Sequence, residues 1–175
     1  MPARPAAPHP ARAADPPTSS RKAALRLELL RALEHALEIA RLAHHAAVEG
    51  ATHEDARAEN DKDTRGLEQS YLARGHARRV AELEAGVAAL EAMEWLALEP
   101  DTPISLGALV SVEEGDHLRT VLLAAHGGGL TLAGGVTVVT PGSPMGRALL
   151  GRVAGDECEV QIGAQPHDLT ILTVE

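Results

Sequence analysis

Acidic side chains crowd into one short stretch between two segments that have the periodicity of helices. The stretch runs from Gly50 to Arg65, and its acids are Glu54, Asp55, Glu59, Asp61 and Asp63. Carboxylate oxygens are the ligands that Mg²⁺ prefers, and this ion keeps several waters and needs only one or two protein carboxylates. The stretch can therefore share in binding a Mg²⁺ ion at the active site of another enzyme.

The same acids have a simpler interpretation that needs no ligand. Negative charge near the start of a helix interacts favourably with the helix dipole, and a run of charge keeps an exposed turn soluble. This explanation accounts for two or three of the acids, so the residues alone leave both interpretations open.

The segment before the acids predicts a helix with a coiled-coil seam. Apolar residues recur from Leu25 at alternating gaps of four and three, and Gly50 is expected to end the helix. The positions of this seam are Leu25, Leu29, Ala32, Ala36, Ile39, Ala43 and Ala46, widened by Leu33, Leu37 and Ala40.

The segment after the acids repeats the spacing and must run back along the first helix. Its seam positions are Ala73, His76, Val80, Leu83, Val87 and Leu90. We therefore expect an antiparallel coiled-coil hairpin over residues 21–98, with an acidic tip near 50–64. Helices of about 25 residues extend roughly 35–40 Å, so the tip must project into solvent or into a partner.

The pattern changes after a polar linker at 99–103, and residues 104–175 predict a small β-rich domain with one short helix. In the helix, Ser143 is a candidate cap, Pro144 suits the first position and Gly151 ends it. The predicted strands are Leu106–Val112, Leu118–Ala124, Val136–Thr140, Glu157–Ile162 and Leu169–Val174, with a further short one at Leu130–Leu132. Residues 1–20, rich in Pro and Ala, are expected to form a disordered tail. The fold class is thus α+β.

Composition limits the possible functions. The formal net charge of −9 disfavours direct binding to nucleic-acid backbones and favours a partner with a basic surface. Cys158 is the single cysteine, so no disulfide or Cys-based zinc site forms within the chain, and we expect a structural role for it. No apolar run reaches the length of a membrane span. We expect a cytoplasmic monomer without a membrane partner.

Two pieces of the sequence resemble one known family. The residues from Glu59 to Glu68, with Ser70–Gly75 and Arg79–Glu84, resemble the second coiled-coil helix of the bacterial GreA/GreB transcription elongation factors. The run Ser143–Arg152, Ser-Pro-Met-Gly-Arg-Ala-Leu-Leu-Gly-Arg, resembles the signature of that family's FKBP-like C-terminal domain. The resemblance covers roughly residues 22–175 in order.

This resemblance implies a partner and a mechanism. In the family, the hairpin enters the secondary channel of RNA polymerase, where tip carboxylates help to hold a second catalytic Mg²⁺ that activates water to cleave backtracked RNA. Such a factor is not itself an enzyme, and it meets nascent RNA and DNA only through the elongation complex. The resemblance also places Ser143, Pro144, Met145 and Arg147 near the polymerase-facing side.

The family's pair of tip acids does not align uniquely with this sequence. Alignment on Asn60 matches Glu59 and leaves Asp55 one position out of step, whereas alignment on Arg79 places Glu59 and Lys62 at the pair. We therefore assign the metal-binding role to a cluster, Asp55, Glu59, Asp61 and Asp63.

Other functions remain as alternatives. The chain can be a secondary-channel regulator that does not stimulate cleavage, or a coiled-coil interaction module. Prolyl isomerase activity is disfavoured because the β-rich domain contains no Phe, Tyr or Trp to wall a pocket. We expect the histidines of the hairpin, His35, His44, His45 and His53, to be solvated, and the glycines at 127–129 to form a turn.

Overall fold

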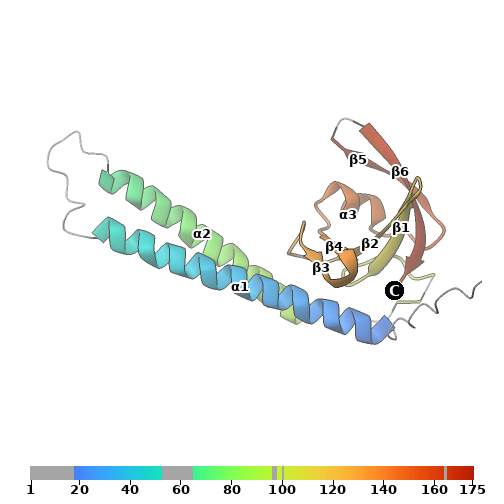
Figure 1. Cartoon of the computed structure of the whole chain (residues 1–175), viewed down its shortest axis with the longest axis horizontal. Coiled ribbons are helices and arrows are strands. Elements are labelled where there is room, and N and C mark those ends of the chain that lie inside the picture. The colour runs from blue at the N-terminus through green and yellow to red at the C-terminus, as the bar shows by residue number, and fades with distance from the viewer. Residues whose placement is uncertain (1–17, 53–64, 96–97, 100, 164) are drawn as a thin grey trace, which may run out of the picture.

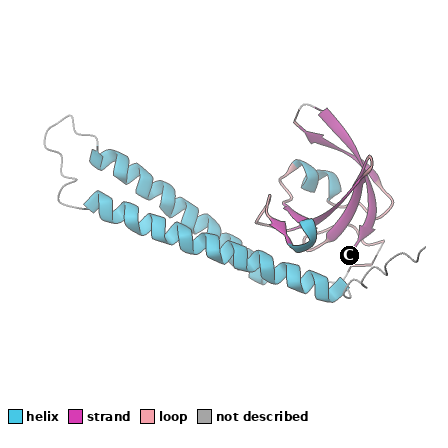
Figure 2. Cartoon of the chain, in the orientation of Figure 1, coloured by secondary structure: helices cyan, strands magenta, loops and turns pink. Residues whose placement is uncertain are grey.

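A pair of long helices precedes a six-stranded sheet that carries one short helix (Figures 1 and 2). This arrangement confirms the predicted α+β class, a helical hairpin followed by a small β-rich domain. The computed structural model describes residues 18–52, 65–95, 98–99, 101–163 and 165–175.

The two long helices are α1 (Thr18–Thr52) and α2 (Arg65–Ala92). At 1.5 Å per residue, α1 is about 50 Å long. The prediction that Gly50 ends the first helix was wrong, because α1 continues through it to Thr52. A glycine costs a helix only about 1 kcal/mol relative to alanine, so it does not have to end one.

The buried line of α1 differs from the predicted seam. Its members are Leu25, Leu29, Leu33, Leu37 and Ala40, which face Leu83 and Leu90 of α2 and the sheet. Ile39, predicted in the seam, is 55% exposed. The buried positions advance mainly in steps of four because the base of α1 is covered from two sides, by α2 and by the sheet, whereas a simple pair follows gaps of four and three.

The hairpin is well packed only near its base. Beyond Ala40 no described side chain of α1 is fully buried, and none of the described side chains of α2 before Leu83 is buried. Leu72 is 57% exposed. An ion pair between Arg41 and Glu84, with N and O atoms 2.7 Å apart, lies near the end of the packed part. The distal half therefore projects from the β-rich domain with little core of its own (Figure 1).

The sheet has the strand order β3-β4-β2-β1-β6-β5. Neighbouring strands are antiparallel except for β2 and β4, which run parallel. The strands are β1 (Leu109–Glu114), β2 (His117–Leu123), β3 (Thr131–Leu132), β4 (Val136–Val139), β5 (Glu157–Ile162) and β6 (Gln165–Val174), with a single 3₁₀ turn, η2 (Ala133–Gly135), between β3 and β4.

Each predicted strand is present; β5 has the predicted ends, and the ends of the others are shifted. β1 begins at Leu109 and not at Leu106, and β6 begins at Gln165, before the predicted start at Leu169. The early part of β6 lacks apolar alternation, but it pairs in register with β5, for example His167 with Val160. Pairing with β5 therefore extends β6 over residues whose own pattern does not predict a strand.

The two faces of the sheet are buried in different ways. On one face, Leu109, Leu122, Val136 and Val138 pack in a single cluster with the leucines of the hairpin base. On the other face, a second cluster includes Val112, Leu123, Leu169 and Ile171 and is covered by Leu149 of the short helix α3 (Pro144–Leu149). The base of the hairpin is therefore the helical layer that covers this first face of the sheet.

Polar contacts fasten the hairpin to the sheet. Lys22 is only 3% exposed, and its Nζ donates a hydrogen bond to the backbone oxygen of Glu175 at 2.9 Å. Both carboxylate oxygens of Glu28 accept from the backbone N–H of Ala133 at 3.0 Å. Burial lowers the pKa of Lys22, and the negative charge of Glu175 opposes that shift. The start of α1 is thus bound to the end of β6 and to η2.

No helix in the described part of the chain combines the length and the apolar character needed to cross a membrane.

Shortening Leu29 to Ala tests the packing between hairpin and sheet. Leu29 is completely buried, and an added Cβ at Gly127 would lie 2.6 Å from its Cδ1. We expect Leu29→Ala to lower the free energy of unfolding by about 2–5 kcal/mol in urea denaturation. Leu42→Ala, on the same helix but 63% exposed, is the control and should change it by less than about 0.5 kcal/mol. Equal losses in the two variants would contradict this packing.

Candidate functional site

The predicted metal-binding cluster lies outside the described residues. Asp55, Glu59, Asp61 and Asp63 belong to residues 53–64, the segment that joins Thr52 at the end of α1 to Arg65 at the start of α2. Among the residues that the structure describes, no group of three or more His, Cys, Asp or Glu side chains has the arrangement of a metal site. The assignment of these four acids therefore stays a prediction.

The predicted polymerase-facing residues lie at the start of α3. The hydroxyl of Ser143 donates to the carbonyl of Thr140 at 2.7 Å and accepts from the N–H of Gly146 at 3.0 Å, so Ser143 caps the helix as predicted. Pro144 occupies the first turn, where its lack of an N–H has no cost. The three features predicted for this helix are confirmed, because Gly151 follows the C-cap residue Leu150 with a positive φ of 78°.

Gly146, the fourth residue of the run Ser143–Arg152, has no room for a side chain. A Cβ built there would lie 1.9 Å from the carbonyl oxygen of Thr140, and the residue is buried. The first turn of α3 therefore presses directly on the end of β4. Leu149, at the other end of the helix, is completely buried in the core beneath it.

The remaining side chains of the run differ in exposure. Pro144 and Arg147 are exposed, and the Arg147 guanidinium donates to the carbonyl of Gly142. Met145 is half-buried against the core. The structure brings Ser143, Pro144 and Met145 together on a groove of about 500 Å³ that also touches Thr140 and Gln161, and it leaves Arg147 outside. This mainly apolar groove can receive a side chain of a partner, and the residues that line it include no nucleophile beside a base.

The hairpin histidines do not form a metal site within the described residues. His35 and His45 are exposed, and His45 Nδ1 lies 3.3 Å from Glu49 Oε2. His44 differs from the prediction, because its Nδ1 is buried without a hydrogen-bond partner. His53 lies outside the described residues.

Cys158 has the structural role that its sequence context predicts. It is 7% exposed and packs in the core beside α3. Burial raises the pKa of its thiol, which keeps it protonated and unreactive at neutral pH.

The glycine turn after β2 has a role that the sequence did not reveal. Gly127 and Gly129 have positive φ angles, as tight turns require. The preceding His126 packs against α2, where an added Cβ at Gly86 would lie 3.2 Å from its ring. The turn therefore contacts the hairpin. The sequence signal for this contact is Gly86, a glycine within a helical pattern, but such a glycine has several possible explanations.

Comparisons with known proteins gave structural matches only. No family model and no curated protein matches the chain. Similar solved structures include GreA factor homolog 1 (Gfh1) of Thermus thermophilus, with 21% identity, 83% of this chain and 94% of that chain covered, and a TM-score of 0.37. Gfh1 of Thermus aquaticus has 22% identity, coverage of 83% and 92%, and a TM-score of 0.39.

A transcription elongation factor GreA/GreB from Nitrosomonas europaea also matches, with 23% identity over 54% of this chain and 78% of that chain, and a TM-score of 0.35. The structures similar to this chain are thus transcription factors of the GreA/GreB class. At these identities and TM-scores, a functional assignment has to rest on the residues themselves.

Substituting Gly146 tests the close contact beneath α3. Gly146→Ala places a methyl group on the Thr140 carbonyl, and we expect the free energy of unfolding to fall by about 1–3 kcal/mol, the usual cost of an overpacked site. Gly142→Ala is the matched control, because a Cβ there meets nothing within 4 Å. Thermal denaturation of both variants measures the difference. A Gly146→Ala protein as stable as the control would disprove the contact.

Proposed function

We propose that this protein is a transcription elongation factor of the GreA/GreB class, which binds RNA polymerase and inserts its hairpin into the secondary channel. There it stimulates cleavage of backtracked RNA. The observation that carries the proposal is the run Ser143–Arg152. At the junction of β4 and α3, its serine caps the helix, its proline lies in the first turn, and its glycine packs against the backbone of Thr140. A chance match of letters would not be expected to meet these constraints together.

The hairpin supports the same function. It is about 50 Å long, its packed core ends near Ala40 and Leu83, and the distal half is not covered by the sheet. A projection of this kind suits insertion into a channel, because its stability comes from the base and the described part of its distal half lies away from the β-rich domain.

The proposed mechanism assigns the chemistry to the tip acids and the polymerase together. Asp55, Glu59, Asp61 and Asp63 would supply carboxylate oxygens to a Mg²⁺ shared with the polymerase active site, and a metal ion there lowers the pKa of bound water. The chain's own contribution is to bring negative charge to that site and to hold it there. Hydrolysis itself belongs to the polymerase, so the protein is not an enzyme.

The start of α3 would provide the docking contact at the channel mouth. Pro144 and Arg147 are exposed, and Ser143 and Met145 border the neighbouring groove. A rigid, capped helix end presents these side chains at low entropic cost, which favours binding.

A second function is consistent with the sequence at the tip. Lys62 lies among the acids, and one of the two alignments places it where the family has a carboxylate. A positive charge there would weaken Mg²⁺ binding by repulsion. In that case the protein would occupy the channel and regulate the polymerase without stimulating cleavage.

Removing the tip acids tests the metal-binding role. With Asp55, Glu59, Asp61 and Asp63 all changed to Ala, we expect stimulation of RNA cleavage in a backtracked complex of the cognate polymerase to fall at least 100-fold, as loss of a metal-holding group does. Binding to the polymerase, measured in parallel, should persist.

The control carries the same change of charge at a different place. Glu113, Glu157, Glu159 and Asp168 are exposed on the sheet, and their substitution by Ala should leave cleavage within about threefold of the wild-type rate. Equal loss in both quadruple variants would assign the effect to net charge. Binding of the wild-type protein with unchanged or slower cleavage would establish the regulator, and absence of binding would exclude both functions.

A single charge at the start of α3 tests the docking contact. Pro144→Glu introduces a carboxylate into the proposed interface. Glutamate is also favourable in the first turn of a helix, so the helix itself should be preserved. We expect the affinity for the polymerase to fall about tenfold, equivalent to about 1.4 kcal/mol. Thr173→Glu, exposed on β6, adds the same charge elsewhere and should change affinity by less than twofold. An unaffected Pro144→Glu protein would place the docking contact elsewhere.

A further inference from the structure

A cleft of about 580 Å³ separates the hairpin from the β-rich domain. α1 and α2 contribute one wall, and the glycine turn at 126–130 contributes the other. The volume lies within the range of small-molecule sites, which occur preferentially where two domains meet. At Gly128 the cleft meets the groove that borders the start of α3.

The walls of this cleft combine an apolar surface with a few polar groups. Small and branched side chains make up its apolar part, namely Ala32, Leu33, Ala36, Leu83 and Leu130. Its polar side chains are Arg79, Glu82 and His126. This composition resembles that of sites for ligands with an apolar body and one charged group.

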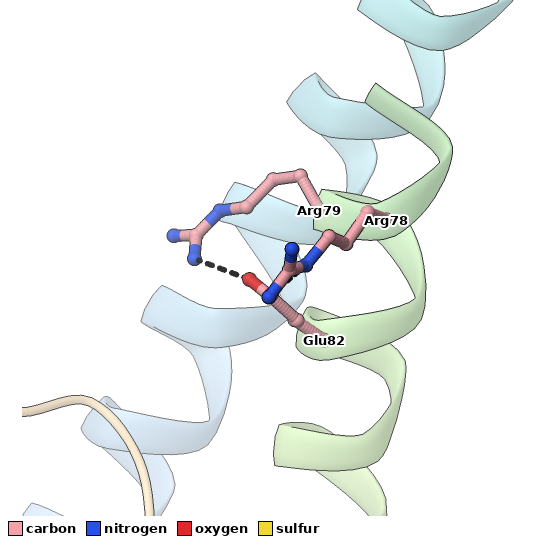
Figure 3. Close-up of polar contacts among 3 residues, drawn as sticks. All are labelled: Arg78, Arg79 and Glu82. Carbon is pink, nitrogen blue, oxygen red and sulfur yellow. Dashed lines mark hydrogen bonds and ion pairs between the residues drawn. The ribbon is translucent and has the colours of Figure 1, made fainter. Parts of the chain in front are cut away.

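Arg79 is the cation available to a ligand. Arg78 Nε donates to Glu82 Oε1 at 3.0 Å, whereas Arg79 approaches Glu82 Oε2 only to 3.8 Å, too far for a hydrogen bond. Arg79 extends sideways from α2 over α1, and Arg78 stays beside α2 (Figure 3). The carboxylate of Glu82 is thus used mainly by Arg78, and the Arg79 guanidinium keeps its donors for another acceptor.

The glycine turn adds backbone donors on the opposite wall. Gly127 and Gly128 line the cleft, and within the described residues their N–H groups donate to no acceptor. Consecutive amides in a turn with positive φ angles make a concave site for anions. An anion between Arg79 and this turn would therefore meet donors from both walls.

From these observations we propose that the cleft binds a small amphipathic organic anion. A carboxylate, sulfonate or phosphate group would accept hydrogen bonds from Arg79 and from the turn, and an apolar body would rest on Leu33, Ala36 and Leu83. Because the ligand contacts both the hairpin and the β-rich domain, binding stabilises their joint. This site is independent of the proposed role in transcription.

The test uses 8-anilinonaphthalene-1-sulfonate, an aromatic anion whose fluorescence rises on binding, with the full-length chain. The wild-type protein should bind one equivalent saturably. Arg79→Gln should weaken binding at least fivefold, because a charge-assisted hydrogen bond is lost. Arg31→Gln removes the same charge from an exposed position of α1 that does not line the cleft, and should change affinity by less than twofold.

A second variant tests the apolar part of the cleft without changing charge. Ala85 lines the cleft but is exposed, so Ala85→Leu adds volume there while keeping a good helix former. It should weaken binding of the dye at least fivefold with an unchanged helical circular dichroism signal. Amide resonances of Gly86, Gly127 and Gly128 should shift when the dye binds to the wild-type protein.

The proposal is overturned if the dye does not saturate, or if the two arginine variants respond equally. It is also overturned if the shifted amides lie along the distal hairpin, around the exposed Leu72, because the dye would then report only exposed apolar surface.

Discussion

The packing of the hairpin base against one face of the sheet is the interaction on which the rest of the structure depends. The face offers Leu109, Leu122, Val136 and Val138, and α1 covers it with leucines that are almost fully buried. Each buried aliphatic side chain contributes about 1.5–3 kcal/mol. Because the chain has no Phe and few other aromatics, this stability depends on many small contacts rather than on a few large ones.

This constraint separates the molecule into a rigid part and a projecting part. The base of the hairpin shares a core with the sheet, and α3 covers the opposite face of the sheet through Leu149. The distal hairpin has only partly buried seam residues and a few ion pairs, which are weak when exposed. The base thus fixes the direction in which the two helices project from the β-rich domain.

Sequence reasoning succeeded where the signal is local. The gaps of four and three predicted both helices, alternation predicted the strands, and Ser143 with Pro144 predicted the start of α3. These patterns report the secondary structure in which a residue lies, because each element has its own period.

It was less successful where partners are distant in the chain. Lys22 and Glu175 are separated by 153 positions, and Glu28 and Ala133 by 105. Ile39 was placed in the seam by its spacing, and it lines a groove between α1 and α2 with His76 and Leu83, but it is 55% exposed because few side chains pack over it there. The cleft around Arg79 was missed because its walls come from three separate segments. The acids of the tip were identified by composition and resemblance, and the described residues do not include them.

In the proposed function, the hairpin brings its acidic tip to the metal site of RNA polymerase. Site-specific photocrosslinking tests it most directly, with a benzophenone side chain in place of Lys62, between the tip acids. In a backtracked complex, we expect crosslinks to the polymerase segments that surround the catalytic Mg²⁺, and none when the channel is blocked. Crosslinks confined to the outer surface of the polymerase, or none at all from a bound protein, would contradict it.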